Sequence, residues 1–130
     1  MRVEGNQAES FWEDAEVIST YTRAQAIEDG VLVDLSKLSP NDTRLYKHNV
    51  ACTSAVWALV EKAAKKGQSL WVTVWDICLM SIHPVKELDE STRLFKVSIP
   101  LGGKTYLLKI VCSGGDNGEP VITIMFPDED

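Results

Sequence analysis

The residues best suited to acid–base or nucleophilic chemistry in this 130-residue sequence are two histidines and three cysteines: His48, His83, Cys52, Cys78 and Cys112. No Cys-x-x-Cys spacing occurs, and the histidines belong to no metal-ligand pattern. Each cysteine lies in an apolar stretch, where cysteines usually serve as small core residues. No Gly-x-Ser-x-Gly nucleophile motif is present. The sequence therefore predicts no catalytic residues, no metal site and no cofactor.

An enzyme is the second hypothesis, as a small nuclease or a nucleotide-modifying protein. In that case His48 or His83 acts as the acid or base, while Lys109 and Thr123 project from a sheet to bind a phosphate. Spacing alone does not supply the mutual geometry that such groups need. The pI of about 4.9 also argues against an RNA substrate, because a phosphate-binding surface is normally basic.

Asp76 is the most informative single residue, because it follows Trp75 inside a strongly apolar segment. A carboxylate in such surroundings must be hydrogen-bonded, paired with a cation or placed at a rim, since an unpaired buried charge is costly. One hypothesis makes Asp76 a rim residue bound to an indole N–H or a lysine. The other makes it the polar anchor of a pocket lined by Trp57, Trp71 and Trp75.

Asp34 is the second carboxylate in an apolar run, the expected strand at 31–36. Because strand side chains alternate between two faces, Asp34 can stand on the polar face without being buried. The functional alternative pairs Asp34 with Arg23 or Lys37 at the edge of a cleft.

Charge is unevenly distributed along this chain, whose net charge is −6. Residues 1–42 carry nine acids and three bases, residues 43–86 two acids and six bases, and residues 87–130 eight acids and four bases. The acidic ends would repel nucleic-acid phosphates, so direct nucleic-acid binding is not expected. The lysines of the middle section are expected to form a solvated helix face, with a small basic patch as the alternative.

Acidic clusters at both ends, ESFWEDAE and FPDED, suggest a protein partner. Inhibitors of nucleic-acid-handling proteins can present carboxylates where the partner expects phosphates. Solubilising tails are the simpler explanation of the same clusters. The predicted partner-binding residues are Phe11, Trp12, Glu13, Asp14, Arg23, Asp34, Asp76, Asp128, Glu129 and Asp130.

The elements that must position these residues follow from local signals. Thr22 and Gln25 form a capping box that begins a helix, and Gly30 suits the left-handed residue that ends it. The strand at 31–36 follows, and the turn residues after it predict a loop at 37–52.

Two further helices are predicted to form a hairpin. The first begins at Thr53 or Ser54 and ends near Lys66, and the second covers 69–82. The expected buried stripe of the first helix is Val56, Leu59, Val60 and Ala63. The expected buried stripe of the second is Trp71, Val74, Trp75, Cys78 and Ile82.

Alternating strands at 93–101, 104–112 and 119–126 predict a three-stranded antiparallel meander, with a Gly-Gly turn between the first two. The predicted fold class is therefore α+β: a short N-terminal helix and strand, a helical hairpin, and the C-terminal meander packed against the helices. Residues 17–130 form a single domain in this prediction, preceded by an acidic arm at 1–16.

The motifs YTRAQAIEDGVLVDLS and GEPVITIM resemble an uncharacterised family of small bacterial, plasmid and phage proteins. The residues at matching places are Tyr21, Arg23, Asp29, Gly30, Asp34, Trp57, Trp75, Gly118, Glu119 and Pro120. The resemblance covers roughly residues 18–130 and implies a phage or mobile-element context. It supports a helix at 69–82, and it carries over no catalytic residue.

The leading functional hypothesis is a non-enzymatic protein-binding factor of phage or mobile-element origin. Its expected partner is a host protein or complex, such as a nuclease, which it inhibits through an acidic surface in the manner of an anti-CRISPR or antirestriction protein. We expect a cytoplasmic protein, since the sequence shows no signal peptide and no membrane-spanning run. A structural homodimer that pairs through a strand at 119–126 is a further alternative.

Overall fold

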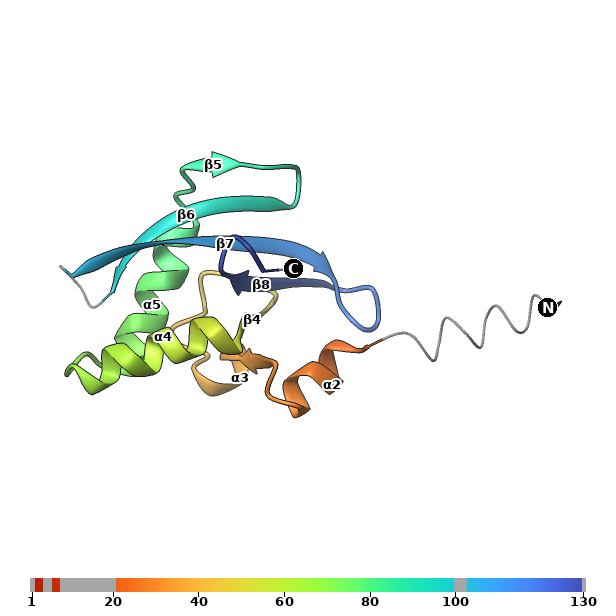
Figure 1. Ribbon diagram of the computed structural model, residues 1–130, viewed down its shortest axis with the longest axis horizontal. Helices are drawn as coiled ribbons and strands as arrows, with labels where there is room; N and C mark the ends of the chain where they lie inside the picture. Colours follow the sequence, from red (N-terminus) through yellow and green to blue (C-terminus); the bar gives the residue numbers. More distant parts are fainter. Residues whose placement is uncertain (1, 4–5, 8–20, 100–102, 130) are drawn as a thin grey trace.

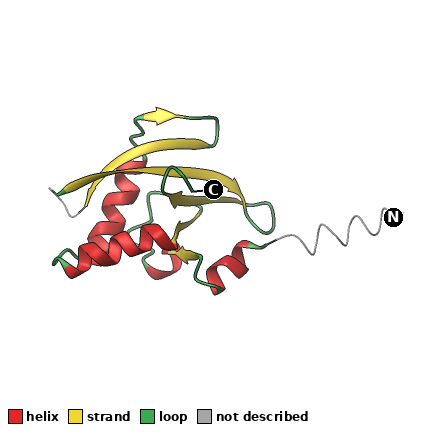
Figure 2. Cartoon of the chain, in the orientation of Figure 1, coloured by secondary structure: helices red, strands yellow, loops and turns green. Residues whose placement is uncertain are grey.

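A six-stranded mixed sheet with helices against it organises the chain. The computed structural model describes residues 2–3, 6–7, 21–99 and 103–129 (Figure 1). The strand order is β3-β4-β8-β7-β6-β5, and within the described residues four helices, α2 to α5, accompany the sheet (Figure 2). Two short strands, β1 (Arg2–Val3) and β2 (Asn6–Gln7), pair in parallel with each other and not with this sheet. The predicted α+β class is confirmed.

The first helix begins at the predicted capping box. In α2 (Arg23–Glu28) the Thr22 side chain accepts the Gln25 N–H, and the Gln25 side chain accepts the Thr22 N–H. The chain leaves the helix through Gly30, whose φ of 79° lies in the left-handed region that glycine adopts without strain. Local sequence signals therefore located this helix correctly.

The following strand is shorter than predicted. The strand β3 (Leu32–Asp34) ends where the side chain of Asp34 accepts the Lys37 N–H and caps a four-residue helix, α3 (Leu35–Leu38). The prediction of a strand through residue 36 was wrong for its last two residues, because an aspartate at an N-cap satisfies amides that a continuing strand would need elsewhere.

The predicted loop at 37–52 was wrong at its end, because it contains most of a central strand. The strand β4 (Asn49–Thr53) pairs with β3 in antiparallel and with β8 (Pro120–Met125) in parallel. Its residues 50–53 are buried. This parallel pairing joins the N-terminal half of the domain to β8, the strand that comes last in the sequence.

The helical hairpin is confirmed. In α4 (Ser54–Lys65) the Thr53 side chain accepts the Val56 N–H, and the helix ends before Gly67, whose φ is 97°. In α5 (Leu70–Ser81) the chain runs back toward β6, on the same side of the sheet as α4 (Figure 1). All four residues of the predicted α4 stripe are buried: Val56, Leu59, Val60 and Ala63.

The buried face of α5 differs from the predicted stripe. Trp71 and Ile82 were expected to be buried, but they are 43% and 42% exposed. Val74 and Cys78 are buried as predicted, and the remaining buried residues are Thr73, Ile77 and Ser81. Because α5 is apolar around its whole circumference, its hydrophobic periodicity does not indicate which face packs on the sheet.

The C-terminal meander is confirmed and forms part of the larger sheet. It comprises β6 (Thr92–Ile99), β7 (Lys104–Gly114) and β8, while β5 (Lys86–Glu87) pairs with the start of β6. Residues 100–102, where the sequence predicts part of the turn, lie outside the described residues. Since β8 is bonded to β4 on one side and to β7 on the other, a dimer through an open 119–126 edge is wrong.

The sheet has one face in the core and one face that bears polar groups. Core residues Val50, Ile110, Ile122 and Ile124 pack with residues of α4 and α5. Their strand neighbours alternate to the opposite face, where the side chain of Thr123 meets α2. The helices α4 and α5 therefore cover one face of the sheet, and the other face carries the polar contacts with α2.

Candidate functional site

Arg23 joins α2 to the polar face of the sheet. Its Nη1 donates to Thr123 Oγ1 at 2.8 Å, and its Nη2 donates to the Ile122 carbonyl at 2.9 Å and to Asn49 Oδ1 at 3.2 Å. The guanidinium is part-buried, and its Nε is covered without a hydrogen-bond partner. Arg23 therefore crosslinks α2, β4 and β8.

Carboxylates surround this guanidinium. Burial lowers the pKa of Arg23, and the negative charges of Asp34, Asp116 and Glu119 oppose that shift. Asp116, in the β7–β8 loop beside α2, also accepts the backbone N–H groups of Arg23 and Ala24 at 2.8 and 3.1 Å (Figure 1). These contacts fix the loop against the first turn of α2.

Asp34 is linked to Arg23 through an asparagine. Asn49 accepts a hydrogen bond from Arg23 and donates one to Asp34 Oδ1 at 2.9 Å. The same oxygen accepts the Lys37 N–H, so the predicted partner Lys37 contacts Asp34 through its backbone. The structure therefore brings Arg23 and Asp34 into one network that holds secondary-structure elements together.

The acidic C-terminal residues do not share one environment. Glu129 Oε2 accepts hydrogen bonds from Thr53 Oγ1 and the Phe126 N–H, each at 2.8 Å, and its carbonyl accepts from Lys109 Nζ at 2.5 Å. Asp128 is exposed, and Asp130 lies outside the described residues. Glu129 therefore folds back on the domain, contrary to the predicted role of a freely presented acid.

A cleft of about 820 Å³ lies between α2, the β7–β8 loop and the polar face of the sheet. Its lining residues include Tyr21, Arg23, Ala26, Asp116, Thr123, Met125 and Glu129. Several of its polar side chains already bind within the domain: Arg23 to Thr123, Asp116 to the α2 amides and Tyr21 to Asp29. These polar side chains therefore hold the elements of the domain together, and their contacts do not point to a ligand.

The outer face of α5 has a different character. Asp76 is the one charged residue of this twelve-residue helix. On the side opposite the buried Val74 and Ser81, the helix presents Val72, Trp75, Asp76 and Leu79 at successive i, i+3, i+4 and i+7 positions. Trp71 and Met80 extend this surface at its margins. We call these six residues the α5 outer face.

Side chains of the α5 outer face are substantially exposed for their type. Val72 is 47%, Trp71 43% and Met80 37% exposed, while Trp75 and Leu79 are half-buried. The Arg44 guanidinium lies 4.8 Å from the centroid of the Trp75 ring and covers part of it. Exposed apolar side chains gathered on one helix face are typical of a protein-interaction surface.

Asp76 lies within this apolar face in an unfavourable electrostatic state. Its Oδ2 is buried and makes no hydrogen bond with the described residues, and burial raises the pKa of its carboxyl group. A neighbouring hollow of about 350 Å³ between α5 and β6 is lined by Asp76, Leu79, Met80, Lys96, Val97, Ser98 and Thr105. The carboxylate thus borders a site in which a donor group could bind it.

The hypothesis that Asp76 anchors a pocket lined by three tryptophans, one of the two considered for this residue, was wrong. Trp57 packs against the hydrophobic core, and Trp71 is exposed. The hollow that Asp76 borders is lined on the α5 side by Leu79 and Met80, and by none of the three tryptophans. Sequence reasoning missed Val72, Leu79 and Met80, although the absence of charge from every other position of α5 was a usable signal.

The residues of the nuclease hypothesis do not share a cleft. Thr123 lines the cleft beside α2 and accepts a hydrogen bond from Arg23. His48 and His83 are both exposed and do not line this cleft. Lys109 does not line it either, and its amino group binds the Glu129 carbonyl. Burial raises the pKa of both Cys52 and Cys78 to about 12, so neither thiol is activated. Within the described residues no His, Cys, Asp and Glu side chains gather to hold a metal ion.

Four predicted partner-binding residues, Phe11, Trp12, Glu13 and Asp14, lie outside the described residues. Nothing structural therefore bears on the acidic aromatic cluster of the predicted arm. Of the other predicted positions, Arg23, Asp34 and Glu129 serve structural contacts, and Asp76 is the one at the centre of an apolar surface.

Comparison with known proteins places the chain in a family. The pattern of DUF6573, a family of unknown function, matches residues 8–130. The chain belongs to the DUF6573 family. This membership agrees with the predicted resemblance to an uncharacterised family and assigns no chemistry to any residue. No curated protein and no solved structure shows a significant match to this DUF6573 member.

Membrane insertion through a helix finds no support in the described part of this DUF6573 chain. None of its described helices combines the length and the apolar character needed to cross a bilayer. The apolar surface of α5 belongs to a twelve-residue helix and needs another explanation.

Proposed function

We propose that this protein is a non-enzymatic protein-binding factor whose partner docks on the α5 outer face. One observation carries the proposal: the Oδ2 of Asp76, which is buried and has no partner in the part of the chain that the structure describes, lies in an otherwise apolar and partly exposed helix face. A buried carboxylate oxygen without a donor destabilises the isolated domain, and a partner that supplies the donor removes that penalty.

The composition of this face supports a protein partner. Tryptophan is enriched among residues that dominate binding energy at interfaces, and Trp71 and Trp75 lie one turn apart on α5. A helix that is apolar around its whole circumference is normally covered on all sides. Here α4 and the sheet cover one side, which leaves Val72 and Leu79 for the partner.

The complementary partner surface is apolar and carries a lysine or arginine that reaches Asp76. A cationic donor is favoured over a neutral one because it pairs with the ionised carboxylate in a partly dehydrated site. The net charge of −6 also attracts a basic partner and accelerates its encounter with the protein. In this proposal the acidic segments contribute to steering, while α5 provides the contact.

The proposed biological setting rests on the sequence resemblance to phage and plasmid proteins. We propose that the protein acts as an anti-defence inhibitor of the anti-CRISPR or antirestriction type, on a nuclease or immune complex in the cytoplasm of the host cell. Partners of this class handle nucleic acid and present basic surfaces, which agrees with the lysine or arginine that Asp76 requires.

The test uses the purified protein and purified host nuclease and immune complexes. We expect at least one complex to bind the protein and to lose activity on binding. The substitution Val72→Glu should weaken that binding by at least about 100-fold, because it places a charge at the centre of an apolar interface. Ala58→Glu is the matched control, since it adds the same charge to an exposed position of α4.

Three outcomes would contradict the proposal. The first is the absence of both co-migration and inhibition across the candidate complexes. The second is equal binding by wild type and Val72→Glu when circular dichroism shows that the variant is folded. Equal loss in Val72→Glu and Ala58→Glu would also exclude the α5 outer face as the specific surface.

A further inference from the structure

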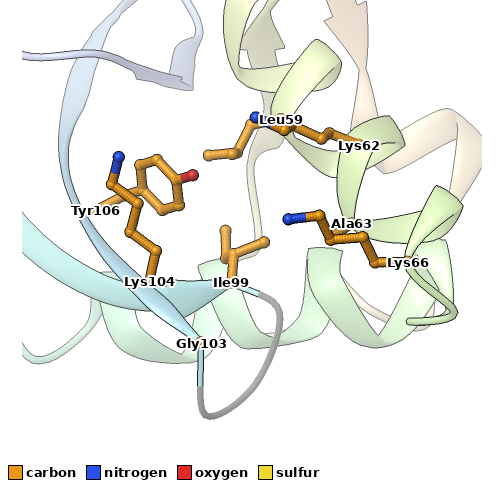
Figure 3. Close-up of a pocket in the computed structure, with 8 residues that line it drawn as sticks. All are labelled: Leu59, Lys62, Ala63, Lys66, Ile99, Gly103, Lys104 and Tyr106. Carbon is orange, nitrogen blue, oxygen red and sulfur yellow. The ribbon is translucent and has the colours of Figure 1, made fainter.

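A second surface lies between α4 and the β6–β7 hairpin, apart from the α5 outer face. It is a hollow of about 260 Å³ lined by eight residues, none of them acidic and none from α5. Three lysines line it: Lys62 and Lys66 from α4, and Lys104 from β7, whose amino group lies beside the Tyr106 ring on the side away from α4 (Figure 3). This concentration of positive charge is unusual in a chain of net charge −6.

The floor of this hollow is apolar and aromatic. Leu59 and Ala63 contribute from the inner side of α4, Ile99 comes from the end of β6, and Tyr106 comes from β7. Figure 3 shows Lys66 extending from α4 toward Ile99, with the Tyr106 hydroxyl pointing toward α4. Lys104 Nζ lies 5.4 Å from the centroid of the Tyr106 ring. The hollow thus combines ammonium donors, a phenol hydroxyl and an apolar floor.

We propose that this hollow is a binding site for a small phosphate monoester that carries an aromatic or apolar group. The phosphate would bind the ammonium groups of Lys62 and Lys66, and the flexible Lys104 side chain would turn toward it from the far side of the Tyr106 ring, since lysine binds phosphate as a point charge. The organic group would cover Leu59, Ile99 and Tyr106. Positions 62 and 66 are one turn apart on α4, so their like charges repel each other, and a bound dianion relieves that repulsion.

Size and charge select a small molecule over a nucleic acid. A volume of about 260 Å³ lies just below the range of roughly 300–1,000 Å³ that holds drug-sized ligands. A polynucleotide would extend beyond the three lysines and meet the field of an acidic protein, which opposes binding of a phosphate backbone. This site is independent of the proposed partner-binding function.

The structural alternative assigns the α4 lysines to the helix dipole. Cations in the last turn of a helix are favourable, and Lys62 and Lys65 both occupy that turn. Lys65 shares the favourable position in the last turn but does not line the hollow. Substituting Lys65 therefore tests the dipole effect without removing a residue of the proposed ligand site.

The test is calorimetric titration of the full chain with phenyl phosphate, and with inorganic phosphate for comparison. We expect one molecule of phenyl phosphate per chain, bound at least threefold more tightly than inorganic phosphate because the ring covers the apolar floor. The double variant Lys66→Gln/Lys104→Gln should lose at least tenfold in affinity. The control Lys47→Gln/Lys65→Gln, with the same net charge, should stay within twofold of wild type.

Amide shifts in NMR spectra provide a readout of position, and those of Ala63 and Tyr106 should move on titration. Absence of phenyl phosphate binding would overturn the proposal, as would equal losses in the two double variants. Equal affinity for phenyl phosphate and inorganic phosphate would overturn the assigned ligand class. A single-stranded oligonucleotide that binds more tightly than phenyl phosphate would replace it with a nucleic-acid surface.

Discussion

The two helices of the hairpin have the same length and pack on the same sheet, yet their outer faces differ completely. On α4 the exposed positions hold Glu61, Lys62 and Lys65, and the buried positions hold aliphatic residues. On α5 the exposed positions hold Trp71, Val72 and Met80. The first helix is therefore an ordinary amphipathic surface helix, whereas the second is apolar on both sides.

This difference teaches that folding of the domain alone does not account for the sequence of α5. The inner face of α5 supplies Val74, Ile77 and Cys78 to the core, which is sufficient to dock the helix. Apolar residues on the outer face add nothing to that core and increase the risk of aggregation. The partner proposed above would cover these residues.

The same contrast separates two partly buried charges. The Arg23 guanidinium makes hydrogen bonds to Thr123, Asn49 and the Ile122 carbonyl, and acidic residues surround it. The Asp76 carboxylate has a buried oxygen with no donor among the described residues. Arg23 therefore meets most of its hydrogen-bonding capacity inside the domain, with only its Nε left without a partner among the described residues, whereas the buried oxygen of Asp76 has no donor there.

The largest expected effect compares the two faces of α5 directly. Ile77→Ala, on the inner face, should lower the free energy of unfolding by about 2–5 kcal/mol because it leaves a cavity in the core. Val72→Ala, on the outer face, should change it by less than about 0.5 kcal/mol. Urea denaturation of both variants measures the difference. Similar losses would show that the outer face is buried within the protein itself.

The next effect concerns the satisfied charge. Arg23→Ala removes the three guanidinium hydrogen bonds and should cost about 2 kcal/mol of unfolding free energy. Arg23→Lys should recover only part of the loss, because an ammonium cannot reproduce the planar fork. Denaturation curves for both variants provide the measurement. Wild-type stability in Arg23→Ala would mean that other contacts hold α2 on the sheet.

The smallest expected effect has the opposite sign and concerns the unsatisfied charge. Asp76→Asn should stabilise the free protein at neutral pH by at most on the order of 1 kcal/mol, because it removes the charge from a half-buried carboxylate that has one buried oxygen without a donor among the described residues. The same substitution should weaken partner binding, since the partner then loses its ionic contact. Asp128→Asn is the control, because it removes the same charge from an exposed aspartate outside the α5 outer face.

The pH dependence of this effect has a definite direction. The raised pKa of Asp76 means that the folded state penalises the ionised carboxylate, so wild type loses stability as pH rises through that pKa. Below the ordinary carboxyl pKa of about 3.9 the penalty is absent, and the curves for wild type and Asp76→Asn should converge. A stability difference that stays constant from pH 3 to pH 7 would contradict a buried, ionised Asp76.

Much of the fold could be predicted because its signals are local. The capping box at Thr22, the aliphatic stripe of α4 and the alternation of Phe95, Val97 and Ile99 each identify an element from a few neighbouring residues. The strand β4 was missed because five residues following turn-forming residues carry little local signal. Its position is determined by pairing with β8, and local patterns do not contain that information.

The candidate site was predicted only at Asp76. A carboxylate in an apolar segment stands out in any sequence, whereas Val72 and Leu79 look like core residues until the packing of α5 is known. Arg23 and Asp34 also stood out as polar residues near apolar ones. Their hydrogen bonds with Asn49 and Thr123 depend on strands that meet only in the folded sheet.

The interior position of β8 has a consequence for biosynthesis. While the chain is being made, β3 and β4 can pair, and so can β5, β6 and β7, but the two groups lack the strand that joins them. Until residues 120–125 leave the ribosome, β4 and β7 each present a bare hydrogen-bonding edge. The nascent protein therefore passes through a stage that is vulnerable to intermolecular strand pairing, and a truncation before Pro120 would leave it there permanently.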